Sequence, residues 1–264
     1  MISRLRTLLA PKAAPKAPAR VPAGERVYAI GDIHGRADLF DEMILAIEAD
    51  DAARGRAETT VILLGDLVDR GPDSALVLRT ARQWQERRRV RILAGNHEQM
   101  FLDSFERTEV LRNFLRHGGR ETLLSYPVTR EDYDAATLDE LKDMMPGFVP
   151  AEDIAFIRGF EDHVAIGDYL FVHAGIRPGV PLEDQQVSDL RWIRGEFLED
   201  RRDHGFVVVH GHTICEDVVE RPNRIGIDTG AFMSGVLTAV GLEGAERWYI
   251  TAGDGDIQPG DTVQ

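Results

Sequence analysis

Five short segments of the chain combine glycine with carboxylate, imidazole or amide side chains, the groups that bind metal ions and transfer protons. Asp32 and His34 are separated by one residue, so in an extended turn both side chains can face one side and hold a transition-metal ion. Asp66 and Asp69 are costly to bury together unless cations compensate their charge. His97 is the side-chain type best suited to proton transfer near neutral pH. The five segments are 31–35 (GDIHG), 65–71 (GDLVDRG), 95–98 (GNHE), 173–175 (HAG) and 210–213 (HGHT).

Taken alone, each segment could be a structural turn with a surface ion pair or a packed histidine. Five such turns that point the same way are hard to explain as independent structural choices. Their ligand atoms, four nitrogen or neutral groups and two carboxylates, exceed what one tetrahedral ion needs. They fit two ions about 3.5–4 Å apart that share one carboxylate, the arrangement used for phosphoryl displacement. Without a thiolate, the set favours manganese, iron or zinc. The six candidate ligands are Asp32, His34, Asp66, Asn96, His173 and His212.

A buried strand is expected before each segment, because a short apolar run rich in β-branched residues precedes it. These runs are 27–30, 60–64, 90–93, 169–172 and 206–209, and further strands are expected at 225–227, 236–240 and 247–250, the last two joined by a hairpin loop. Helical patterns follow the first two runs, with one apolar face over 39–47 and another over 76–84. Strand, turn, helix and strand in alternation predict an α/β sheet, whose strand carboxyl ends hold ligand sites.

The rest of the chain is expected to divide into an insertion and two tails around one catalytic domain, 25–252. Residues 99–165 have a mostly helical pattern broken by glycine and proline, and no strand is expected there. Residues 1–24 are basic and rich in proline and alanine, which predicts a flexible extension. A transit peptide or a weak membrane-surface contact stays open as another role for this extension. Residues 253–264 are expected to be a frayed polar tail.

Composition excludes several classes of protein. The 264 residues carry a net charge of −14, which disfavours non-specific binding to nucleic acid or to an anionic membrane. No run of about 18 apolar residues is present, so no transmembrane helix is expected. The single cysteine, Cys215, fits a reducing compartment, and we expect a cytoplasmic protein. The oligomeric state is left open by the sequence.

Together the five motifs resemble those of the calcineurin-like metallophosphoesterase superfamily, and more narrowly those of the bacterial phosphoprotein (serine/threonine) phosphatase family. The segments 192–194 (WIR) and 227–231 (IDTGA) are further matches. The resemblance implies an α/β fold, a four-layer α/β/β/α sandwich of two mixed sheets. It also implies two divalent transition-metal ions, Mn²⁺ first, with iron or zinc as alternatives.

The resemblance carries a role to each matching position. Asp32 and His34 match the ligands of the first metal, Asp66 the carboxylate that bridges both metals, and Asn96, His173 and His212 the ligands of the second. His97 matches the general acid and Asp69 the residue that orients it. Arg70 and Arg194, with Asn96, match the groups that bind the phosphate. His210 matches no metal ligand of the family. It could contact a ligand or only pack in the core, and the packing role is favoured.

The implied reaction is direct in-line attack on phosphorus by a hydroxide that bridges the metals, with no phosphoenzyme, while His97 protonates the departing alkoxide. Two substrates compete: a phosphorylated protein, or a symmetrical dinucleoside tetraphosphate. The dinucleotide hydrolases usually lack an acid at the position of Asp69, so the protein phosphatase is the first choice. Small phosphoesters are expected to be hydrolysed in either case. A non-catalytic binding module is disfavoured because every ligand, the acid and both arginines are present.

Overall fold

The first sheet carries the amino-terminal motifs. The computed structural model describes residues 18–253 of the chain. The sheet has the strand order β10-β9-β1-β2-β3, with β1, β2 and β3 parallel and with β9 and β10 antiparallel to their neighbours. Its strands are β1 (Glu25–Ile30), β2 (Glu58–Leu63), β3 (Val90–Ile92), β9 (Val236–Glu243) and β10 (Glu246–Gly253). The predicted strands 27–30, 60–64, 90–93, 236–240 and 247–250 all lie in this sheet.

The second sheet carries the carboxyl-terminal motifs and has the order β4-β5-β6-β8-β7. Its three inner strands are parallel, and both edge strands are antiparallel to their neighbours, so this sheet is also mixed. The strands are β4 (His163–Ile166), β5 (Tyr169–Val172), β6 (Val207–His210), β7 (Val219–Arg221) and β8 (Arg224–Gly226).

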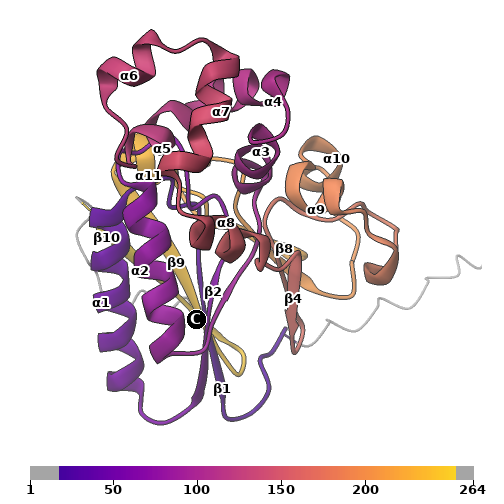
Figure 1. The fold of residues 1–264 in the computed structure, drawn as a ribbon. Helices are drawn as coiled ribbons and strands as arrows, with labels where there is room; N and C mark the ends of the chain where they lie inside the picture. The colour runs from indigo at the N-terminus through magenta and orange to yellow at the C-terminus, as the bar shows by residue number, and fades with distance from the viewer. Residues whose placement is uncertain (1–17, 254–264) are drawn as a thin grey trace, which may run out of the picture.

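Alternation along the strands explains how the layers pack. In β1, Val27 and Ala29 face the second sheet and join a core that includes Phe171 and Val209. Tyr28 and Ile30 point to the other side and pack with the helices α1 (Ala37–Arg54) and α2 (Ser74–Arg87). The short helices α9 (Val187–Trp192) and α10 (Gly195–Leu198) pack on the outer face of the second sheet. The predicted four-layer α/β/β/α sandwich is confirmed (Figure 1).

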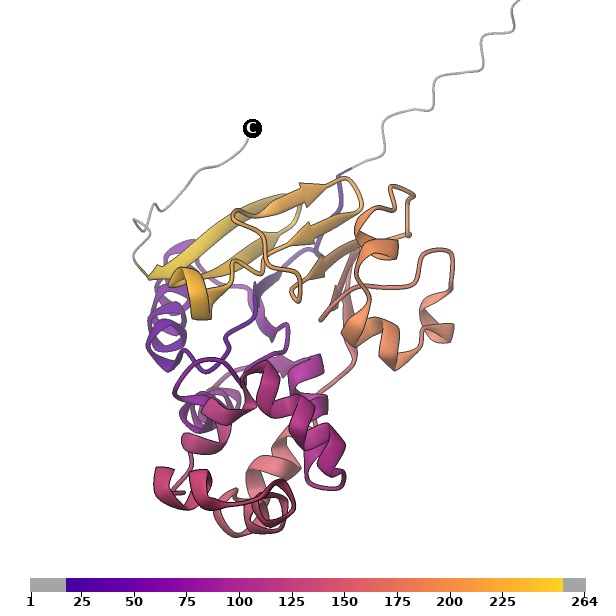
Figure 2. The same cartoon turned by 90° about the horizontal axis from the view of Figure 1, so that it is seen from above.

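The predicted helical insertion forms a cluster of helices beside the sheets, magenta to pink in Figure 2. It contains α3 (Asn96–Ser104), α4 (Thr108–Phe114), a π-helical turn (Leu115–Gly119), α5 (Arg120–Leu124), α6 (Arg130–Ala135), α7 (Leu138–Phe148) and α8 (Ala151–Arg158). The prediction that no strand lies within 99–165 is wrong at its end, where β4 begins at His163. This edge strand has one buried side chain, Val164, so it lacks the apolar run that marks the inner strands. The exposed edge strand β7 was not predicted for the same reason.

The segment just before β1 is part of the fold, so the predicted flexible extension 1–24 is wrong for residues 18–24. Val21 is 2% exposed and its N–H donates to the carbonyl of Gly244 at 2.9 Å. The backbone N–H of Arg20 donates to the Asp168 carboxylate at 2.9 Å. Residues 1–17 of that extension lie outside the described residues. Of the predicted tail 253–264, Gly253 ends β10 and the remainder lies outside the described part. None of the helices within residues 18–253 combines the length and the hydrophobicity of a membrane-spanning segment.

Candidate active site

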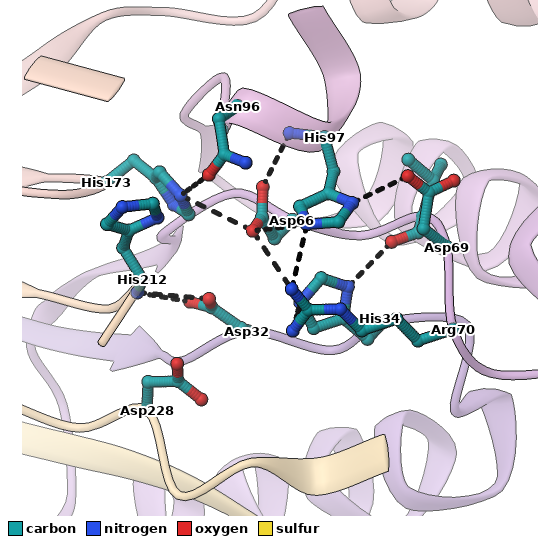
Figure 3. A network of polar contacts seen from close by, with 12 residues as sticks. Asp32, His34, Asp66, Asp69, Arg70, Asn96, His97, His173, His212 and Asp228 are labelled. Atoms are coloured by element: carbon teal, nitrogen blue, oxygen red, sulfur yellow. Dashed lines mark hydrogen bonds and ion pairs between the residues drawn. The ribbon is translucent and has the colours of Figure 1, made fainter. Parts of the chain in front are cut away.

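The five motifs meet at the carboxyl ends of strands from both sheets, as their spacing predicted (Figure 3). Asp32 and His34 follow β1, and Asp66 follows β2. Asn96 and His97 begin α3, after β3, and His173 and His212 follow β5 and β6. All these side chains are buried. The sheets therefore bring residues that are up to 180 positions apart into one polar cluster.

Asp66 lies at the centre of this cluster. Its Oδ2 is 3.6 Å from Nε2 of His34, 3.4 Å from Nε2 of His173 and 3.9 Å from Nε2 of His97. Two groups of potential ligand atoms share Asp66, one with His34 and His97 and the other with His173 and His212; within each group the atoms lie within 4.8 Å of one another. One carboxylate common to two groups is what a pair of cations with a shared ligand requires.

Backbone carbonyls fix how the imidazoles face Asp66. Nδ1 of His34 lies 2.8 Å from the carbonyl of Val68, and Nδ1 of His173 lies 2.8 Å from that of Leu64. Each Nδ1 therefore carries the proton, and each Nε2 lone pair points into the cluster. There the Arg70 guanidinium lies 3.0 Å from Nε2 of His34, and Oδ1 of Asn96 lies 3.0 Å from Nε2 of His173. Burial lowers the pKa of His34 to about 3, despite the opposing charge of Asp66, so the imidazole is neutral. A neutral imidazole is the form that binds metal.

His212 shows that the cluster fits a bound cation. Its Nε2 is buried and has no hydrogen-bond partner among the described residues. Burial, the neighbouring His173 and the positive charge of Arg194 lower the pKa of His212 to about 3. A buried polar nitrogen without a partner is unfavourable unless a ligand satisfies it. The imidazole, amide and carboxylate groups of the cluster match divalent manganese, iron or zinc.

Asp228 joins the cluster, although no role was predicted for it. It is 3% exposed, lies beside Asp32 (Figure 3) and accepts a hydrogen bond from the N–H of Gly230 at 2.9 Å. Asp32 itself accepts from the backbone N–H of His212, at 3.0 Å and 3.2 Å to its two oxygens. Burial and the negative charge of Asp66 raise the pKa of Asp228 to about 6. The signal was available, because Asp228 follows β8 as the other acids follow their strands.

His97 and Asp69 form a close pair. Nδ1 of His97 is 2.6 Å from Oδ2 of Asp69, which is fully buried. Burial lowers the pKa of His97, but the charges of Asp66 and Asp69 outweigh it, and the pKa lies above its usual value. The charges of Asp66 and Asp69 thus favour the protonated imidazole of His97, against the positive charge of Arg70, which lowers its pKa.

Arg70 contacts the cluster, and Arg194 acts on it through its charge. The Arg70 guanidinium lies 3.0 Å from Nε2 of His34 through one nitrogen and 3.0 Å from Nε2 of His97 through the other. Its Cζ lies 4.7 Å from the centre of the Phe232 ring, an aromatic neighbour that was not predicted from the sequence. Arg194 is exposed, directly precedes α10, and acts on His212 through its charge. Two guanidinium groups beside the ligands suit the oxygens of a phosphate.

Among the non-glycine residues of the described part, a positive φ occurs only at the site. Five such residues have a positive φ: His34 (48°), Asp66 (51°), Asp69 (73°), Arg70 (71°) and His212 (64°). Each such residue costs on the order of 1–3 kcal/mol and persists only where the surroundings hold it. The observation locates the functional site independently of the motifs.

Glu98 is one of the groups that hold this backbone. Its buried carboxylate accepts the N–H groups of Gly95 at 2.8 Å, Asp66 at 2.9 Å and Leu67 at 2.7 Å. One acid thus connects the turn after β2 to the turn after β3. In the sequence, Glu98 stands out only as part of the motif 95–98, and no role was predicted for it.

Two glycines allow the carboxylates to approach the backbone. A Cβ added at Gly95 would lie 2.0 Å from Oδ1 of Asp66, and one added at Gly211 would lie 2.0 Å from Oδ1 of Asp32. His210, the last residue of β6, is packed: its ring lies 5.2 Å from that of Phe197, and its Nδ1 lies 3.0 Å from the carbonyl of Gly211. The favoured packing role of His210 agrees with this placement.

Comparison with known proteins identifies the family. The family model described as calcineurin-like phosphoesterase matches residues 25–224. A Bacillus velezensis protein named bis(5'-nucleosyl)-tetraphosphatase PrpE (asymmetrical) is 31% identical over 79% of this chain and 86% of its own length. A Nitrosospira multiformis protein named bis(5'-nucleosyl)-tetraphosphatase, symmetrical, is 26% identical over 77% of this chain but only 66% of its own length.

A further relative carries a different name. The Salmonella typhimurium protein named serine/threonine-protein phosphatase 1 is 26% identical over 82% of this chain and 92% of its own. Among solved structures, that of a proposed diadenosine tetraphosphatase superposes with a TM-score of 0.61 at 19% identity, covering 90% of this chain and all of the other. That likeness supports the fold. The chain belongs to the calcineurin-like phosphoesterase family of enzymes that hydrolyse phosphoesters.

Proposed function

We propose that this protein is a dinuclear-metal-dependent phosphomonoesterase that acts on alkyl phosphates, most of all on phosphoserine and phosphothreonine in proteins. The observation that carries the proposal is the contact of 2.6 Å between His97 and Asp69. An alkoxide is a poor leaving group and needs a proton as it departs, and a buried acid–imidazole pair supplies one. A nucleotide released from a dinucleoside polyphosphate leaves as a stable anion and needs no such donor.

The metal ligands would be Asp32, His34, Asp66, Asn96, His173 and His212, placed as described above. When bound, two divalent cations supply an activated water and neutralise charge on the phosphate. Arg70 and Arg194 hold the phosphate oxygens and stabilise charge on the transferred group. His97 donates its Nε2 proton to the leaving oxygen, and Asp69 stabilises the imidazolium until then. Manganese as the metal and a cytoplasmic location remain predictions from the sequence.

The second candidate is a dinucleoside tetraphosphate hydrolase. It is favoured by the names of two relatives, from Bacillus velezensis and Nitrosospira multiformis. The same ligands and arginines would serve this reaction, but His97 would be dispensable for it.

The test compares kcat/KM for a phosphoserine peptide and for diadenosine tetraphosphate, with Mn²⁺, in the wild type and in His97→Asn. We expect the wild type to prefer the peptide. His97→Asn should lose about 10²- to 10⁴-fold on the peptide and much less on the dinucleotide. His204→Asn, which changes a histidine outside the site, is the control. A strong wild-type preference for the dinucleotide would replace the first candidate by the second.

A further inference from the structure

The insertion contributes a buried hydroxyl to the pair formed by His97 and Asp69. Thr122, in α5, is fully buried, and its Oγ1 donates to Oδ1 of Asp69 at 2.6 Å. The same Oγ1 accepts the backbone N–H of Asp69 at 2.8 Å. Oδ2 of Asp69 faces His97, so the two oxygens of one carboxylate connect Thr122 to the imidazole. Thr122 therefore fixes both the backbone and the side chain of Asp69.

The contact falls where the backbone most needs support. Asp69 and Arg70 are consecutive residues with φ of 73° and 71°. The N–H of Asp69 is held by Thr122 and by the hydroxyl of Ser74 at 3.1 Å. The N–H of Arg70 donates to the carbonyl of Gly118 at 3.0 Å, in the π-helical turn that leads into α5. The π-helical turn and α5 thus contact the backbone of both strained residues.

We propose that Thr122 is a positioning residue for proton transfer: it holds the Asp69 carboxylate in the orientation that directs His97 toward the leaving group. The inference rests on the proposed function. Its consequence is that the helical insertion takes part in the reaction through Thr122, in addition to any contact with substrate. An unanchored carboxylate can rotate away from the imidazole, and a displacement of about 1 Å can cost ~10²-fold in rate.

The experiment separates this role from a merely structural one by the leaving group. Thr122→Val keeps the shape and removes the hydroxyl; Thr122→Ser keeps the hydroxyl. Each variant is assayed with Mn²⁺ on a phosphoserine peptide, which needs a proton donor, and on p-nitrophenyl phosphate, which has a good leaving group. Metal content and the urea midpoint are measured on the same samples.

A matched control lies in the same insertion. Thr129 is exposed, its Oγ1 donates to the Asp132 carboxylate at 2.6 Å, and it accepts the Asp132 N–H at 3.0 Å. Thr129→Val therefore removes the same pair of bonds away from the site. If Thr122→Val does not fold, Thr122→Ala and Thr122→Ser give the same comparison, since they differ only in the hydroxyl.

We expect Thr122→Val to lower kcat on the peptide by about 10- to 100-fold with KM unchanged and little effect on p-nitrophenyl phosphate. Thr122→Ser should restore the peptide activity, and Thr129→Val should match the wild type on both substrates. Equal losses on the two substrates, or no rescue by serine, would refute the positioning role. If His97→Asn also failed to discriminate between them, the general acid itself, and with it the proposed function, would be wrong.

Discussion

The contact between Gly211 and Asp32 gives a sharp test of the metal centre, because one methyl group displaces one candidate ligand. A Cβ at position 211 would lie 2.0 Å from Oδ1 of Asp32, and its three nearest atoms all belong to that carboxylate. The oxygen must retreat from 2.0 Å to at least 3.0 Å, a shift of about 1 Å or more. Only the end of a side chain has to move, so Gly211→Ala should fold.

The expected result is loss of one of two cations. Ligand distances tolerate changes of only about 0.2 Å, so a carboxylate displaced this far no longer coordinates. Mutation of a residue that only hydrogen-bonds to a metal ligand lowers metal affinity by about 10- to 100-fold. Loss of a direct ligand should therefore lower it by at least about 100-fold. The wild type and Gly211→Ala are dialysed against Mn²⁺, and elemental analysis gives the number of ions bound per chain. A titration with Mn²⁺ then gives the Kd of each protein.

Gly147→Ala is the control, because this glycine lies in α7 with nothing within 4 Å of an added Cβ. It should bind two ions and be slightly more stable, since alanine favours a helix over glycine by about 1 kcal/mol. Two ions bound by Gly211→Ala with wild-type affinity would show that Asp32 is not a ligand.

Three other predictions use the same protein. Asp66→Asn should strip at least one ion, and elemental analysis that still finds two would exclude Asp66 as the bridge. Glu98→Gln places an amide NH₂ group against backbone N–H donors. It should therefore lower the free energy of unfolding, measured by urea denaturation, by roughly 3 kcal/mol or more. A decrease under about 1 kcal/mol would contradict the anchoring role of Glu98. Val21→Ala should cost about 2 kcal/mol in the same assay, and no loss would mean that residues 18–24 contribute nothing to the fold.

The sequence was informative where burial and chemistry leave a local pattern. Inner strands such as β2 and β5 are continuous apolar runs, so they could be predicted, and glycine-flanked acids and histidines marked their ends. The edge strands β4 and β7 are mostly exposed, so they show no such run. Residues 18–24 were misread because proline and positive charge hid one buried side chain, Val21.

Residues that act through long-range contacts left no local signal. Thr122 reaches Asp69 across 53 positions, and its neighbours in the sequence do not indicate that contact. Glu98 contacts the turn after β2 from about 30 positions away, through backbone groups that any sequence would offer. Only the fold could show these partners, whereas the ligand types were visible from the start.

The candidate ligands come from both halves of the sandwich, since His173 and His212 follow strands of the second sheet and the other four follow strands of the first. An ion held by Asp66 together with His173 and His212 is a cross-link between the halves, and the unfolded chain cannot form it. By mass action, free metal at a hundred times its Kd would add about 2.7 kcal/mol per site to the folded state. Removal of metal should therefore increase the fraction of unfolded, protease-sensitive chain as well as abolish activity. The abundance of the protein would then depend on the metal supply of its cell.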